Sequence, residues 1–194
     1  MAVTRRTAIA TAAFVPAAAL TAPAQQTAAA TSLTAAQLRT LDMFVDRLIP
    51  EDELGPGAAK AGAQNYIDRQ LAGYLAAEKN DFVAGIEGLD AYARRAHGAP
   101  FADLSAEKRD EVLTAMDNNR AEGFTQARTF FNRARRLTLE GTFGDPHYGG
   151  NKDFIGWDLI KYPGPRPAVG PEHQKMATAS TPYHKSAWGD EHSH

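Results

Sequence analysis

Apolar residues recur every three or four positions through the middle of the chain, over residues 33–139. This spacing places them on one face of an α-helix, and no segment alternates apolar and polar residues as a half-buried strand does. The pattern predicts five helices: after Thr34, at about 63–71, at about 76–97, after Ser105, and at about 121–139. We therefore expect an all-α protein, a single helical bundle of about five helices with a long irregular C-terminal arm.

Local signals mark both ends of the first predicted helix. Thr34 is a good N-cap residue, and Gln37 follows three positions later, which is the arrangement of a capping box. Leu33 and Leu38 flank this cap and can form a hydrophobic staple. Pro50 ends the helix because a proline disfavours helical backbone in the residue before it.

Residues 140–164, EGTFGDPHYGGNKDFIGWDLIKYPG, combine five aromatic residues with six glycines. Asp145-Pro146 begins a turn, Gly149-Gly150-Asn151 tolerates positive φ, and residues 153–160 fit a turn of helix. Aromatic side chains in such a segment must pack either on the bundle or on a second protein. Trp and Tyr are typical anchors of protein interfaces. The residues alone leave both interpretations open.

Residues 1–24 are typical of an export signal. Arg5 and Arg6 precede an uncharged run rich in Ala and Thr, which ends in the small-x-small sequence at 22–24. The run is too short and too polar for a stable bilayer span. Adjacent arginines before a weakly apolar run predict a twin-arginine signal, whose route carries folded proteins. An ordinary Sec signal and a disordered Ala-rich leader are the alternatives, and residues 25–32 follow as a linker.

Composition narrows the class of protein. The length of 194 residues fits one domain with its own core. The formal net charge of −2 indicates neither a nucleic acid nor an anionic membrane as a partner. The sequence contains no cysteine, which excludes disulfides, thiolate metal sites and a cysteine nucleophile.

The sequence lacks the common catalytic motifs, among them the G-x-G-x-x-G loop, the G-x-S-x-G elbow and H-E-x-x-H. His147 lies close to Asp145 and could form an acid/base pair with it, although a turn or interface histidine explains the same spacing. A transition-metal site at the end of the chain could use His192, His194, Asp190 and Glu191. A free-standing enzyme, or a small-ligand or metal-binding protein, therefore stays as the alternative to an interaction protein.

Two blocks of sequence resemble one known family. The first runs from LIP-x-DELGPGA through AG to YIDRQL, within residues 48–71. The second runs from FGDP-x-YGGN through GW-x-LI to YPG, within residues 143–164. Both occur in the order found in gluconate 2-dehydrogenase subunit 3, the small subunit of that enzyme. The resemblance covers about residues 33–165.

The resemblance implies an accessory subunit that holds no catalytic residue, cofactor or metal of its own. Its partner would be a large flavoprotein dehydrogenase of the glucose–methanol–choline (GMC) type, which holds FAD and oxidises a sugar, sugar acid or polyol in the periplasm. A cytochrome c subunit, with haem c, often takes the electrons onward. The small subunit would help its partner fold and would carry it, already folded, through the Tat translocase by means of the twin-arginine signal.

With this resemblance, residues 140–164 are interpreted as an interaction loop. We expect its partner interface, as the main contact or as the framework that shapes it, to comprise Asp145, Tyr148, Gly149, Gly150, Asn151, Trp157 and Tyr162. Residues 165–194 extend beyond the resemblance and are expected to form an extended tail. The tail could be disordered or could wrap along the partner, and we favour wrapping because Tyr183 and Trp188 suit a solvated tail poorly.

Overall fold

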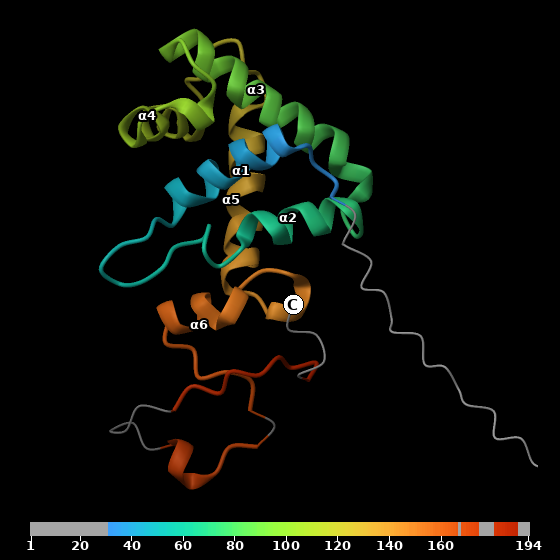
Figure 1. Ribbon diagram of the computed structural model, residues 1–194, viewed down its shortest axis with the longest axis vertical. Coiled ribbons are helices and arrows are strands. Elements are labelled where there is room, and N and C mark those ends of the chain that lie inside the picture. Colours follow the sequence, from blue (N-terminus) through green and yellow to red (C-terminus); the bar gives the residue numbers. More distant parts are fainter. Residues whose placement is uncertain (1–30, 167, 175–180, 190–194) are drawn as a thin grey trace, which may run out of the picture.

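The computed structural model describes residues 31–166, 168–174 and 181–189, and these ranges contain helices and turns but no strand (Figure 1). The α-helices are α1 (Ala35–Leu48), α2 (Ala63–Ala72), α3 (Lys79–His97), α4 (Ala106–Asp117), α5 (Ala127–Phe143) and α6 (Ile155–Leu159). Short 3₁₀ helices are η1 (Ala76–Glu78), η2 (Phe101–Asp103), η3 (Pro146–Tyr148), η4 (Lys152–Phe154) and η5 (Pro171–Gln174). The all-α prediction is confirmed. Within the described ranges, no helix combines the length and apolar character that crossing a membrane requires.

Helix α5 runs along the long axis of the molecule, and α1 to α4 all pack against it (Figure 1). The centre of the core is built from phenylalanine rings. Phe44 of α1 lies 6.1 Å from Phe130 and 6.0 Å from Phe131, and Phe82 of α3 lies 5.2 Å from Phe130, between ring centroids. Burial of each such ring contributes roughly 1.5–3 kcal/mol. The core therefore holds α5 firmly, and the C-terminal end of α5 supports the segment after Phe143.

The start of α1 agrees with its sequence signals. The Oγ of Thr34 accepts a hydrogen bond from the N–H of Gln37 at 3.3 Å, and the Gln37 side chain accepts one from the N–H of Thr34 at 2.9 Å. The backbone just before the cap is tied to α2. The buried carboxylate of Asp68 accepts hydrogen bonds from the N–H groups of Ser32 at 2.8 Å and Leu33 at 2.7 Å. These bonds fix the position from which the chain begins α1.

The fifth helix starts later than its predicted first residue. The hydrophobic pattern predicts a helix over 121–139, whereas α5 begins at Ala127. Residues 121–126 are mostly in turns, with the N–H of Phe124 donating to the carbonyl of Ala121 at 3.1 Å. Phe124 packs against the core from this turn rather than from a helix. Apolar spacing alone does not distinguish a helix from a turn that buries the same side chain.

The same helix also ends later than predicted. It continues through residues 140–143 and stops at Gly144, just before Asp145-Pro146. Towards the end of α5 the hydroxyls of Thr138 and Thr142 donate to carbonyls four residues earlier, at 2.8 and 2.7 Å. Both threonines are fully buried, so these bonds satisfy polar groups inside the helix. Residues 140–143 therefore belong to α5 and not to a loop.

Candidate functional site

Residues 144–164, here called the end frame, fold back against the C-terminal end of α5 (Figure 1). They form η3, η4 and α6 in succession. Asp145 starts the first of these turns, because its side chain accepts a hydrogen bond from the N–H of His147 at 3.0 Å. The end frame thus begins with the Asx-type turn that Asp-Pro favours.

Asn151 joins the end frame to α5. It is fully buried, and its N–H donates to the carbonyl of Gly141 at 2.7 Å. Its side-chain amide donates to the carbonyl of Gly144 at 2.8 Å and accepts from the N–H of Gly156 at 2.8 Å. The last carbonyls of a helix have no partners within the helix. One asparagine supplies partners for two carbonyls at the end of α5 and at the same time fixes the start of α6.

Two glycines allow the end frame to lie directly on the last turn of α5. A Cβ atom at Gly150 would stand 2.1 Å from the carbonyl oxygen of Gly141, and one at Gly156 would stand 1.7 Å from that of Thr142. Both distances are far below van der Waals contact, and the atoms concerned are backbone. No side chain fits at either position, so these glycines serve the close approach of two backbones.

Trp157 packs inward. Only 4% of it is exposed, and its indole N–H donates to the carbonyl of Phe143 at 3.0 Å. Its ring contacts those of Phe154 and Tyr162, at centroid distances of 5.1 and 5.0 Å. Trp157 therefore anchors α6 to the chain's own α5.

The two blocks of sequence that resemble the family lie against each other in the fold. The N–H of Lys152 donates to the carbonyl of Ala61 at 2.8 Å, and a Cβ at Gly149 would stand 3.0 Å from the Cδ of Arg69 in α2. Just before the second block, the Tyr66 hydroxyl of α2 donates to the Glu140 carboxylate of α5 at 3.0 Å. Burial, together with the charge and hydrogen bond of Glu140, raises the pKa of Tyr66 to about 12. The end frame is therefore supported by α2 and the loop before it as well as by α5.

The predicted interface residues divide into an inner and an outer group. Gly150, Asn151 and Trp157 are buried in this chain, whereas 43% of Tyr148 and 39% of Tyr162 are exposed. Asp145 and Gly149 are half-buried. The sequence pattern gave no sign of which aromatic rings face inward, and contact of these residues with a partner stays a prediction.

A second segment covers part of the end frame. Residues 181–189, here called the strap, return from the C-terminal arm and lie on it (Figure 1). The Ser186 hydroxyl donates to one carboxylate oxygen of Asp145 at 2.6 Å, and the Ala187 N–H donates to the other at 2.8 Å. Burial raises the pKa of the Asp145 carboxyl, but the hydrogen bonds from Ser186, His147 and Ala187 outweigh this effect and hold the pKa below its usual value.

Ring contacts and a side-chain hydrogen bond also attach the strap. The His184 ring stacks on Phe154 with 4.9 Å between centroids, and its Nε2 lies 2.8 Å from a carboxylate oxygen of Asp158. The Trp188 ring stacks on His147 at 5.3 Å. Sequence reasoning found Tyr183 and Trp188 as aromatic residues of the tail, but no local signal indicated that Ser186 would meet Asp145, forty-one positions away.

The alternative of an acid/base pair gains no support from this geometry. The Asp145 carboxylate is engaged by the strap and by the backbone of its own turn. In the ranges that the structure describes, no three His, Asp or Glu side chains gather as metal ligands would. Asp190, Glu191, His192 and His194, proposed as metal ligands, lie outside those ranges, and so do Arg5 and Arg6 of the predicted signal.

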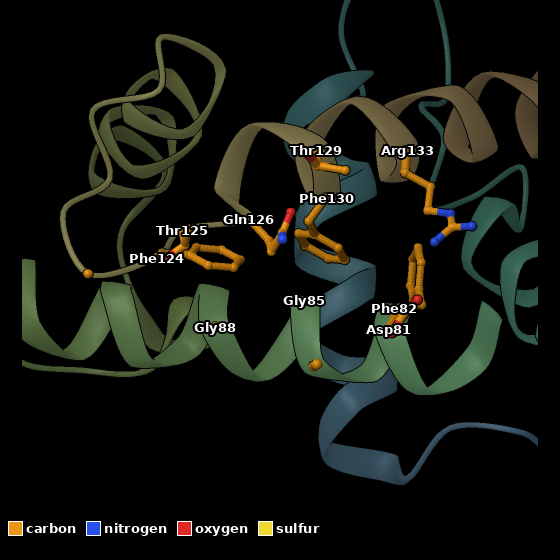
Figure 2. A pocket seen from close by; sticks show the side chains of 12 residues that line it. Asp81, Phe82, Gly85, Gly88, Phe124, Thr125, Gln126, Thr129, Phe130 and Arg133 are labelled. Carbon is orange, nitrogen blue, oxygen red and sulfur yellow. The ribbon is translucent and has the colours of Figure 1, made fainter.

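Figure 2 shows a pocket of about 460 Å³ between α3 and the start of α5. Phe82, Phe124 and Phe130 form its apolar walls, and the backbone of α3 forms its floor. Its lining carries two charged residues, Asp81 and Arg133, and Arg133 is paired with Glu78 outside the pocket. The lining has one carboxylate, that of Asp81, and no histidine, so it holds no cluster of catalytic or metal-ligand groups that would indicate an active site.

Comparison with known proteins agrees with the resemblance of the two blocks. The family model for gluconate 2-dehydrogenase subunit 3 matches residues 35–164, which is more than half of the chain and includes the bundle and the end frame. The strap lies outside the matched region. No curated protein and no solved structure gives a significant match. The chain therefore belongs to the gluconate 2-dehydrogenase subunit 3 family, a family of accessory subunits of a dehydrogenase complex.

Proposed function

We propose that this chain is the non-catalytic small subunit of a periplasmic FAD-dependent dehydrogenase of the gluconate 2-dehydrogenase type. It binds and stabilises the catalytic flavoprotein subunit, which is of the GMC type, and supplies the twin-arginine signal that exports both. The observation that carries the proposal is the family match over residues 35–164. In this proposal FAD belongs to the partner, and haem c belongs to a cytochrome c subunit where one is present.

The shape of the end frame supports a role in binding. Its inner residues, Asn151 and Trp157, are used to hold it on α5. Its outer side presents Tyr148 and Tyr162 together with Ile160, of which 54% is exposed. Large side chains fixed on a rigid support lose little conformational entropy on binding, and Tyr is enriched among residues that dominate interface energies. We therefore assign partner contact to the outer group and support to the inner group.

Co-expression tests the proposal. A GMC-type flavoprotein encoded beside this chain, and lacking its own signal, is expected to be soluble, exported and active in dye reduction only when the chain is present. A version of the chain that begins at Thr31 separates the two roles. It keeps the bonds of Ser32 and Leu33 to Asp68, so it should still give soluble, active flavoprotein but leave it in the cytoplasm. A flavoprotein that is soluble, exported and fully active without this chain would show the proposal to be wrong.

A further inference from the structure

We propose that the strap, residues 181–189, is part of the surface on which the catalytic subunit docks, and that Asp145 and Asp158 hold it in place for this purpose. The inference rests on the proposed function. It adds a segment that lies outside the family match, which ends at residue 164.

The strap is attached by the polar groups on its inner side. Besides the bonds of Ser186 and Ala187 to Asp145, the Tyr183 N–H donates to the carbonyl of Pro163 at 2.9 Å. Arg166 donates to the carbonyl of Thr181 at 2.6 Å. The backbone at Gly164 lies close to the strap, and only glycine allows this because a Cβ there would stand 2.1 Å from the Tyr183 carbonyl oxygen. The strap therefore has a defined place on the end frame.

The apolar groups of the strap, in contrast, stay outside. No residue of the strap is buried, and 61% of Trp188 and 42% of Tyr183 are exposed. A segment that stabilised the core would bury its largest side chains. Here the polar groups are satisfied against the end frame, and the tryptophan is left partly covered. Trp and Tyr in this state gain most from burial against a second protein.

The exposed rings of the strap continue those of the end frame. Trp188 stacks on His147, whose ring meets Tyr148 at 5.1 Å, so the two exposed rings flank one histidine. Ala187, which precedes Trp188 in the chain, lines a groove of about 400 Å³ together with Ile160 and Tyr162. Apolar exposure is thus gathered on one surface made jointly by two segments of the chain.

The occupant of this surface is the catalytic subunit of the complex. The chain belongs to a family of subunits, so one of its faces meets another chain. The groove beside Ala187 is lined mainly by apolar groups, and its one carboxylate, Asp145, is already used by the strap. It is suited to uncharged side chains of a partner. Displacing the strap would remove two hydrogen bonds from Asp145, so the surface is complete only with the strap in place.

Binding measurements on the full chain test the inference. Trp188→Ala should weaken binding to the purified catalytic subunit by at least about tenfold, as for a tryptophan near the centre of an interface. Tyr74→Ala is the matched control, because Tyr74 is 90% exposed and is not part of this surface. It should bind as the wild type does. Unchanged thermal unfolding of both variants will show that neither change acts through the fold.

A second variant tests the attachment. Ser186→Ala should speed amide hydrogen exchange across the strap and weaken binding, while exchange in α1 to α5 stays unchanged. If Trp188→Ala binds as tightly as the wild type, or if loosening the strap tightens binding, the strap is not part of the docking surface. Self-association of the wild type that Trp188→Ala abolishes would identify a second copy as the occupant and overturn the inference. A wild-type chain that binds no catalytic subunit would refute the proposed function as well.

Discussion

Asn151 contributes to the end frame through a side chain that donates one hydrogen bond and accepts another. It must donate to one carbonyl and accept from one amide within a fully buried site, with its own φ at 45°. Asparagine tolerates this left-handed backbone better than most residues. Its carboxamide also has a donor and an acceptor at the same end. The preference for asparagine here follows from backbone geometry, not from contact with a partner.

Replacement of Asn151 is therefore expected to destabilise the chain by itself. Asn151→Ala leaves the Gly144 carbonyl and the Gly156 amide without their partners, which should cost roughly 2–4 kcal/mol of unfolding free energy. Asn132→Ala, at an exposed position of α5, is the control and should change stability by less than about 0.5 kcal/mol. Denaturant unfolding measures both. Equal effects of the two substitutions would contradict the assigned role.

Tyr66 gives a pH-dependent prediction. Its folded pKa of about 12 lies above its usual 10.0, so folding favours the neutral phenol. The stability from this preference is fully present below pH 10 and is lost as the pH rises towards 12. The ultraviolet absorbance titration of the wild type minus that of Tyr66→Phe should give a phenol that ionises near pH 12. A difference titration centred at pH 10 would show that the contact with Glu140 is not made.

At the scale of elements, helices α1 and α6 differ in the interactions that determine where they form. The Thr34 cap and the regular apolar spacing of α1 are local, and the sequence predicted them correctly. Helix α6 has five residues and is held by the end of α5, the Asn151 side chain and Trp157. These contacts join residues that only the completed fold brings together. From the sequence we could therefore identify the glycine-rich segment and its turns. The burial of Asn151 and Trp157 and the position of the strap could not be predicted.

The close contact of α6 with α5 is tested by adding one methyl group. Gly156→Ala puts a Cβ into the carbonyl of Thr142, so α6 must move, at a cost of about 1–3 kcal/mol. Hydrogen exchange should increase in residues 144–164 and stay unchanged in α3 and α4. Asn132→Ala, at an exposed position of α5, is the control. Unchanged exchange in the end frame of Gly156→Ala would contradict the close packing.

At the scale of the whole molecule, the two proposed roles are assigned to opposite ends of the sequence. The predicted signal precedes residue 31, and Asp68 fixes the backbone at Ser32 and Leu33 on α2. The end frame and the strap lie at the other end of α5 from α4 (Figure 1).

The export role leads to a prediction for the pair of proteins. Changing Arg5 and Arg6 together to Lys should leave both this chain and its flavoprotein in the cytoplasm, because the twin-arginine route requires the arginine pair. Fractionation followed by dye reduction measures the distribution, and the amount and activity of the complex in whole-cell extract are the controls. Normal periplasmic activity of the double variant would exclude the twin-arginine assignment.

The meeting of the two sequence blocks has a consequence for folding kinetics. The bond from Lys152 to Ala61 closes a long loop, and loop closure of this kind is slow relative to local helix formation. The end frame also packs on the last turn of α5, so it cannot take up its position before that turn has formed. We therefore expect it to form last, after the bundle. A partner that docks on this surface would then select chains that have finished folding, which is the state that a route for folded proteins requires.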